Sequence, residues 1–175
     1  MNFEELGDWC LTQVVSALAT DEATDEGLSP APSHRRVHFG GIEEVARDQC
    51  CGKTTNGNVP GQVVAAIGRS YPSGAGFPAA VSGQHRPSHP LSWAVPVTVE
   101  IARCTPTLSG SGSIDWAAFE ADNEIRLREA LRIVCHFQAV MGRGVDNPEG
   151  FIVAMSADED SGCKAVRVEL MLHLA

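Results

Sequence analysis

The sequence lacks the features that mark membrane, secreted and nucleic-acid-binding proteins. No stretch approaches the ~20 consecutive apolar residues that span a bilayer, so we expect no contact with a membrane. The first residues, MNFEE, have neither the positive charge nor the apolar run of a secretory signal, so we expect a protein made in a cytoplasm. Basic residues are scarce, since 13 Lys and Arg against 22 Asp and Glu give a net charge of −9. That balance argues against tight binding to DNA, although an acidic surface would let DNA pass without adhering.

Signatures of catalytic chemistry are missing as well. There is no C-x-x-C pair, so neither a zinc ribbon nor a redox dithiol is indicated. No G-x-S-x-G turn presents a serine nucleophile, and the glycines at 110 and 112 lack the Lys-Ser/Thr of a phosphate-binding loop. His85 and His89 are four residues apart, but Pro87 forbids the helical turn that would align two zinc ligands. We therefore expect no catalytic residue, cofactor or metal.

Six cysteines are present, in no recognisable framework. Cys50 and Cys51 are adjacent, and the other four are scattered. Because the chain shows no secretory signal, we expect mostly reduced and buried thiols. A disulfide between the adjacent pair and Cys163 stays open, since connectivity cannot be read from spacing.

Residues 1–175 are expected to form a single domain. An apolar fraction of 43% is enough for a core, and a charged fraction of 20% is too low for a disordered or coiled-coil protein. An acidic, Pro-containing linker is predicted at about residues 20–34. A long loop rich in Gly, Pro, Ser and His is predicted at about 72–91, and a loop of this length is either functional or partly mobile.

Two amphipathic helices are predicted. Apolar residues recur every three or four positions over residues 3–19. The longer helix is expected over 115–141, with Asp115 as its N-cap and Gly142 as its C-terminal stop. Its predicted apolar stripe comprises Trp116, Phe119, Leu127, Leu131, Val134 and Met141. Its predicted solvent face comprises Glu120, Asp122, Glu124, Arg126, Arg128 and Glu129.

Strand patterns account for much of the remainder. Short strands are predicted at 35–39, with Val37 and Phe39 facing inward, and at 62–70. Residues 93–102 alternate with period two, and because Pro96 cannot donate a hydrogen bond, we expect an edge or a bulge there.

The last two strand patterns, 151–155 and 163–174, flank a polar turn from Asp158 to Gly162 and predict an antiparallel hairpin. The order of elements predicts an α+β fold. In it, a mostly antiparallel sheet carries an N-terminal helix and one long helix packed on one face.

Four short blocks of sequence resemble the tail-terminator-like proteins of long-tailed (siphovirus) actinobacterial phages. They are EVARDQCCG at 44–52, GRSYPS at 68–73 followed by Phe-Pro at 77–78, the strand from WAV at 93–95 to EIARCTPT at 100–107, and GCKAVRV at 162–168. They occur in the order that the family shows. The chain departs from the family pattern at QVVA, residues 62–65, where a Trp-containing strand is expected, and it has fewer cysteines over 33–40.

The resemblance implies a structural virion protein without catalytic residues or an obligate cofactor. Such a subunit forms a hexameric ring at the head-proximal end of the tail, where it ends tube polymerisation and docks the filled head. Its partners would be its own copies, the tail tube protein and the head-tail connector or stopper, with DNA passing through without sequence-specific binding. A ring needs different patches that meet head to tail. The candidate contact residues are Pro96, Phe77, His85, His89 and Arg143.

Three other readings stay open, and the last of them is a plain small-molecule or protein-binding module, for which nothing in the sequence favours a ligand. The first is a head-to-tail stopper or connector of the same virion, because fold and charge do not separate such proteins from a terminator. The second is a cysteine- or metal-dependent enzyme, which would need an activated thiol or several ligands that converge in space.

Overall fold

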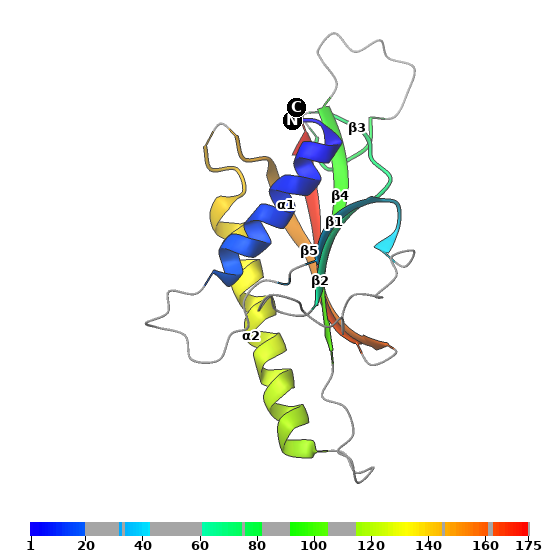
Figure 1. The fold of residues 1–175 in the computed structure, drawn as a ribbon. Helices are drawn as coiled ribbons and strands as arrows, with labels where there is room; N and C mark the ends of the chain where they lie inside the picture. Colours follow the sequence, from blue (N-terminus) through cyan, green and yellow to red (C-terminus); the bar gives the residue numbers. More distant parts are fainter. Residues whose placement is uncertain are drawn as a thin grey trace.

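The computed structural model describes residues 1–19, 32, 34–42, 61–74, 76–81, 92–104, 115–144, 146–160 and 163–174. Over these residues, helices and strands form an α+β fold (Figure 1), which confirms the predicted fold class. The helices are α1 (Phe3–Leu18) and α2 (Trp116–Val140). The strands are β1 (His34–Phe39), β2 (Gln62–Ile67), β3 (Tyr71–Ser73), β4 (Ser92–Cys104), β5 (Glu149–Asp160) and β6 (Cys163–Leu174).

The strands form one six-stranded sheet in the order β1-β2-β4-β6-β5, with β3 paired to the start of β4. All pairs are antiparallel except β1 with β2. β5 and β6 form the predicted hairpin, and β6 has the predicted bounds, but β5 reaches further than expected, so Asp158 lies within β5 and not in a turn. Among the described strands, β1 and β5 are therefore the two outermost.

Helix α1 begins at a reciprocal cap. The Asn2 side chain accepts a hydrogen bond from the Glu5 amide at 2.8 Å, and the Glu5 carboxylate accepts one from the Asn2 amide at 2.7 Å. Gly7 then allows the helix to lie close against β1. A Cβ added to Gly7 would fall 2.5 Å from a methyl carbon of Val37, so even alanine would push the helix away from the strand.

Both helices cover the same face of the sheet (Figure 1), and the main core lies between the two layers. Every second residue along each of these strands points to this helix-covered face, as a pleated sheet requires. Core residues from the sheet are Val63, Ala65, Ile67, Val95, Val97, Val99, Ile101, Val168, Leu170, Leu172 and Leu174. Two smaller clusters lie on the opposite face: Ile42 with Val64 and Ala66, and Ala102 with Cys163 and Ala165.

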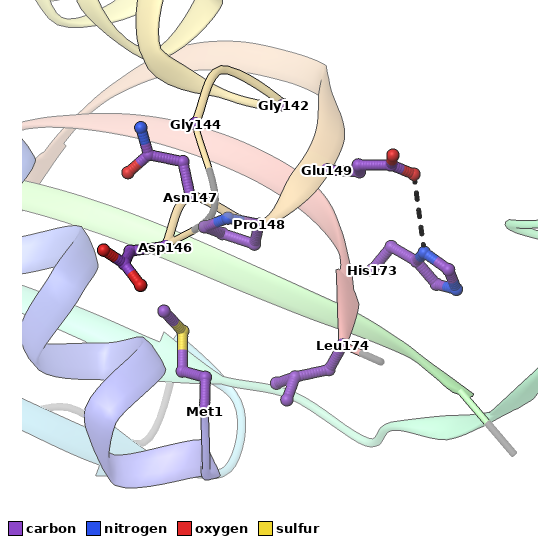
Figure 2. Close-up of a pocket in the computed structure, with 9 residues that line it drawn as sticks. All are labelled: Met1, Gly142, Gly144, Asp146, Asn147, Pro148, Glu149, His173 and Leu174. Atoms are coloured by element: carbon purple, nitrogen blue, oxygen red, sulfur yellow. Dashed lines mark ion pairs between the residues drawn. The ribbon is translucent and has the colours of Figure 1, made fainter. Parts of the chain in front are cut away.

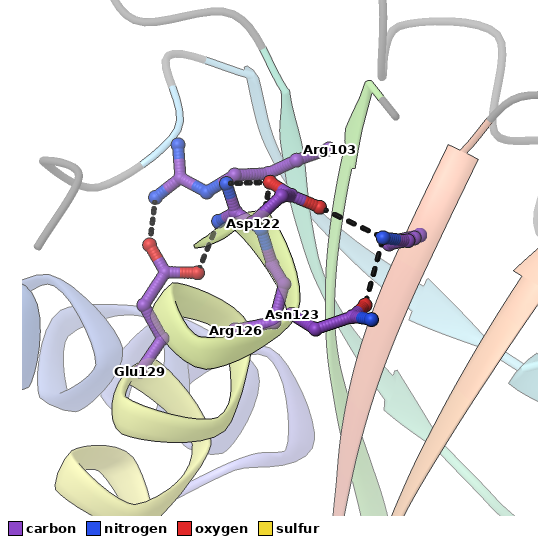
Figure 3. Close-up of polar contacts among 6 residues, drawn as sticks. Arg103, Asp122, Asn123, Arg126 and Glu129 are labelled. Carbon is purple, nitrogen blue, oxygen red and sulfur yellow. Dashed lines mark hydrogen bonds and ion pairs between the residues drawn. The ribbon is translucent and has the colours of Figure 1, made fainter. Parts of the chain in front are cut away.

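A buried network of charged side chains joins α2 to the sheet (Figure 3). Arg103 of β4 donates to Glu129 of α2 at 2.8 Å, and Arg126 also contacts Glu129. Asp122 accepts from Arg126 at 3.1 Å and from Lys164 of β6 at 3.1 Å. The Lys164 ammonium additionally lies over the Phe119 ring, 3.6 Å from its centroid. Burial lowers the pKa of Arg103, and the adjacent Glu129 carboxylate opposes that shift.

The network fixes which side of α2 faces the sheet, and this corrects the sequence prediction. Glu129 was expected in solvent but is only 1% exposed, and Ala130, Ile133 and Phe137 are buried with it. Leu127 and Leu131, expected in the apolar stripe, are 54% and 49% exposed, and Trp116 is exposed as well. The N-cap prediction is confirmed, because Asp115 accepts from the Ala118 amide at 3.1 Å.

Pro96 does not mark a sheet edge, so that prediction was wrong. β4 is central, and its register with β6 runs from Trp93 to Cys104 without a bulge. The Pro96 carbonyl accepts from the Gly68 amide at 2.8 Å, so the nitrogen of Pro96 also faces the β2 side of the strand. There β2 has ended at Ile67 and β3 has not begun, and the missing donor therefore costs no strand pairing.

Within the described chain, no helix is both long and apolar enough to span a bilayer.

We expect Glu129→Gln to destabilise the fold by about 3–5 kcal/mol, because it removes a buried carboxylate that both Arg103 and Arg126 contact. Urea unfolding followed by circular dichroism measures the change. The matched control is Glu124→Gln on the same helix, since Glu124 also contacts an arginine, Arg128, but in solvent. That control should change stability by about 0.5 kcal/mol or less. Equal effects of the two substitutions would contradict a structural role for the network.

Stability should fall as the medium is acidified through the range of histidine titration. His136 of α2 contacts Gln13 of α1 at 3.0 Å, and burial lowers the pKa of His136 below its ordinary 6.5. The unfolded chain then binds a proton more readily than the folded one, so this stabilisation is present above pH 6.5 and is lost as pH falls through the folded-state pKa. His136→Gln should flatten the dependence of unfolding free energy on pH between about 5.5 and 8. An unchanged slope would contradict this assignment.

Candidate assembly surface

The edge strand β5 exposes a row of apolar side chains to solvent. Its described side chains from Val153 to Asp158 are all exposed, and Val153 and Met155 are 53% and 42% exposed. A register shift between Ile152 and Ala154 places a bulge at Val153. Long, exposed and apolar edge strands readily pair with another chain, and soluble proteins usually shorten or charge them.

The flank of α2 beside β5 extends this apolar surface. A groove of about 300 Å³ lies between them, with Leu127 and Ala130 from the helix and Met155, Ala157 and Val166 from the strands. Leu131 is one helical turn beyond Leu127 and is exposed on the same side. We call the exposed residues Leu127, Leu131, Val153 and Met155 the β5 patch. It combines a strand that is outermost among the described strands with aliphatic side chains, which is typical of protein-protein contacts.

The opposite edge of the sheet has a different character. β1 reads His-Arg-Arg-Val-His-Phe, with no acidic residue in a chain of net charge −9. His34 and Arg35 are exposed, and the Arg36 guanidinium donates to Gln62 at 3.0 Å. Phe39 was predicted to face inward but is 60% exposed, beside a hollow of about 410 Å³ that Phe3 and Ile67 also line. The sheet therefore ends in two unlike edges, one basic and one acidic and apolar.

A polar hollow of about 390 Å³ lies where the two chain ends meet (Figures 1 and 2). It is lined by Asp146 and Glu149, and by His173, whose Nδ1 is 3.6 Å from a carboxylate oxygen of Glu149. The described lining residues include no serine, threonine, cysteine or lysine that could act as a nucleophile. The hollow thus offers a histidine-carboxylate pair without a group for it to activate.

The four cysteines that the structure describes fall into two groups. Cys104 and Cys163 are both disulfide-bonded, which corrects the expectation of mostly reduced thiols for these two. Cys10 and Cys135 are free, the first buried in the core and the second exposed on α2. Burial raises the pKa of the Cys10 thiol far above its ordinary value, so Cys10 is not a thiolate near neutral pH. Among the residues that the structure describes, no three His, Cys, Asp or Glu side chains come together as metal ligands.

Comparison with protein-family models and with curated proteins finds no match to this chain. The surfaces themselves must therefore carry the functional argument.

Three of the predicted contact residues are described, and they come from separate segments of the chain. Phe77 stacks within the molecule on Phe151 and His173, with ring centroids 5.8 and 4.9 Å apart. Pro96 is half-buried on the face of the sheet away from the helices, which also carries Phe151 and His173, and Arg143 is exposed in the loop after α2. His85 and His89 lie outside the described residues, as do Glu43, Glu44 and most of the predicted linker and loop.

Sequence reasoning missed the β5 patch for two separate reasons. Leu127 and Leu131 were assigned to the core because apolar spacing alone set the phase of the helix. Val153 and Met155 were recognised as strand residues, but a pattern cannot tell which strand ends a sheet. One signal was available in β1, since its cluster of basic residues is unusual in an acidic chain.

Alkylation of the folded protein should distinguish the two free thiols. We expect iodoacetamide to modify Cys135 quickly and Cys10 only after unfolding, because Cys10 is buried and protonated. Peptide mass mapping reads each site separately, so other cysteines do not interfere. Cys135→Ser supplies the control, in which labelling of its peptide disappears. Rapid modification of Cys10 in the native state would contradict its placement in the core.

Proposed function

We propose that this protein is a structural virion subunit, a tail terminator that forms a ring at the head-proximal end of a phage tail. The observation that carries the proposal is the β5 patch, where an unpaired strand edge and four aliphatic side chains lie together in solvent. A surface of this kind is stable in a soluble protein when another subunit covers it. The assembly is proposed to be a phage tail because four sequence blocks resemble tail-terminator-like proteins.

The charge distribution supports the same role. The net charge of −9 disfavours adhesion of the DNA that must move through a tail. The two unlike sheet edges offer the non-identical patches that a head-to-tail ring requires, whereas a two-fold dimer would use one patch twice. In this role the ring ends tube growth with one rim and presents the other to the connector of the filled head.

We expect the purified protein to form rings that cap the ends of tubes assembled from tail tube protein. Negative-stain electron microscopy measures both ring symmetry and position. Leu127→Glu with Leu131→Glu should abolish the rings, because two carboxylates would be buried in an apolar contact. Ala121→Glu with Ala139→Glu, exposed positions on a different face of α2, should leave them intact. Both double variants should keep wild-type circular dichroism spectra.

Two outcomes would overturn the proposal. A wild-type protein that stays monomeric with tube protein present has no terminator activity. A ring that binds the connector but never a tube end belongs instead to the head-to-tail stopper, which remains the alternative within the virion.

A further inference from the structure

We propose that neighbouring copies in the ring join their sheets, the β5 edge of one copy pairing with the β1 edge of the next. This inference rests on the ring proposed above and names the surfaces that close it. The partner is a second copy of this chain, and its β1 edge carries basic side chains opposite in sign to the acidic end of β5, together with the exposed Phe39 for the apolar row of β5. Three observations support the pairing: the directions of the two edge strands, their alignment along the strand axis, and their opposite charges.

Strand directions permit the pairing without turning either copy over. β1 runs parallel to β2, and each later neighbour in the order β2-β4-β6-β5 reverses direction, so β5 runs opposite to β1. A second copy displaced along the sheet therefore brings its β1 antiparallel to β5. Antiparallel pairs form the straighter hydrogen bonds and allow a continuous sheet across the junction.

The register of the sheet places the two edges at the same height. Following paired residues across the strands, His34 is level with Gln62, Ala102, Ala165 and Asp158. By the same path Val37 is level with Met155, and Phe39 is level with Ile152. A copy that moves sideways without slipping along its strands would pair these residues directly.

This alignment brings side chains of opposite charge together. The basic start of β1, His34 to Arg36, meets the acidic end of β5, where the sequence reads Asp-Glu-Asp at 158–160. Asp158 contacts Arg167 at 3.4 Å within its own copy, yet its side chain stays 44% exposed and can accept from a second cation. Opposite charges on facing strands stabilise a pair, and like charges destabilise it. A shift by one residue would move every side chain to the wrong face.

The alignment also matches apolar side chains on the helix-covered face. Val37 of the next copy would lie beside Met155, and its exposed Phe39 would lie beside Ile152 and the bulged Val153. Both the largest exposed side chain of β1 and the exposed aliphatic residues of β5 are covered by one contact. The groove between α2 and β5 borders the same junction, so Leu127 and Leu131 extend it.

Ring size follows from the strand count. With strands about 4.8 Å apart, the five-strand path and its junction add about 24 Å of perimeter per copy. Six copies would then give a ring about 45 Å across between strand axes, and strand tilt would widen it.

A charge exchange between the two edges tests the pairing. Asp158→Lys alone and His34→Glu alone should each raise the protein concentration needed for ring formation by about tenfold or more. The double variant carrying both exchanges should return to within about threefold of wild type, because it places a carboxylate on β1 level with an ammonium on β5. Asp8→Lys, the same charge change on the exposed side of α1, is the control and should assemble normally. Size-exclusion chromatography with light scattering reads the assembly.

A second variant is independent of charge pairing. Met155→Lys places a cation in the apolar row of β5 and should also prevent ring formation, with its fold checked by circular dichroism. Rings that form normally with Asp158→Lys and with Met155→Lys would refute the edge pairing while leaving the terminator proposal standing. Single exchanges that fail and a double exchange that does not recover would also refute the register. Absence of wild-type rings would refute the terminator proposal itself.

Discussion

The contact between Arg103 and Glu129 determines how α2 lies on the sheet. Glu129 is 1% exposed and contacts Arg103 of β4, so rotating the helix to bury Leu127 instead would separate Glu129 from Arg103 and Asp122 from Lys164. Unpaired buried charges cost far more than the burial of one leucine gains. The ionic network thus outweighs the apolar spacing of the helix, and two leucines are left in solvent beside β5.

That orientation has a consequence for the surface as a whole. The aliphatic side chains that α2 leaves outside adjoin the one long strand edge that is also apolar. Each feature alone is unremarkable, because scattered exposed leucines and short open edges are common. Their coincidence along one side of the molecule produces a contiguous contact surface. The basic residues of β1 lie at the opposite edge of the sheet, so the proposed pairing brings two unlike edges together.

The sequence allowed the elements to be predicted better than their arrangement. Period-two alternation located β4 and β6, and the Asp115 cap located α2, because those signals depend on local geometry. The prediction of an edge at Pro96 was wrong. A missing backbone hydrogen-bond donor destabilises a strand only where the neighbouring strand would accept that bond, and at Pro96 the neighbour changes from β2 to β3. The inward face of α2 was misassigned because its partners, Arg103 and Lys164, are distant in sequence. Contacts of that kind leave no periodic signal.

Unlike edges carry a hazard, because a chain that can bind its own copy head to tail can also extend without limit. Closure depends on the angle between successive copies, which the twist of the sheet supplies. The bulge at Val153 adds local twist at the junction strand, and the acidic end of β5 restricts the register to one alignment. A closed ring leaves no free strand edge, as in a barrel, whereas an open chain always leaves two. In the proposed ring, the same features that let β5 pair with a second copy therefore favour a finite assembly once the last copy meets the first.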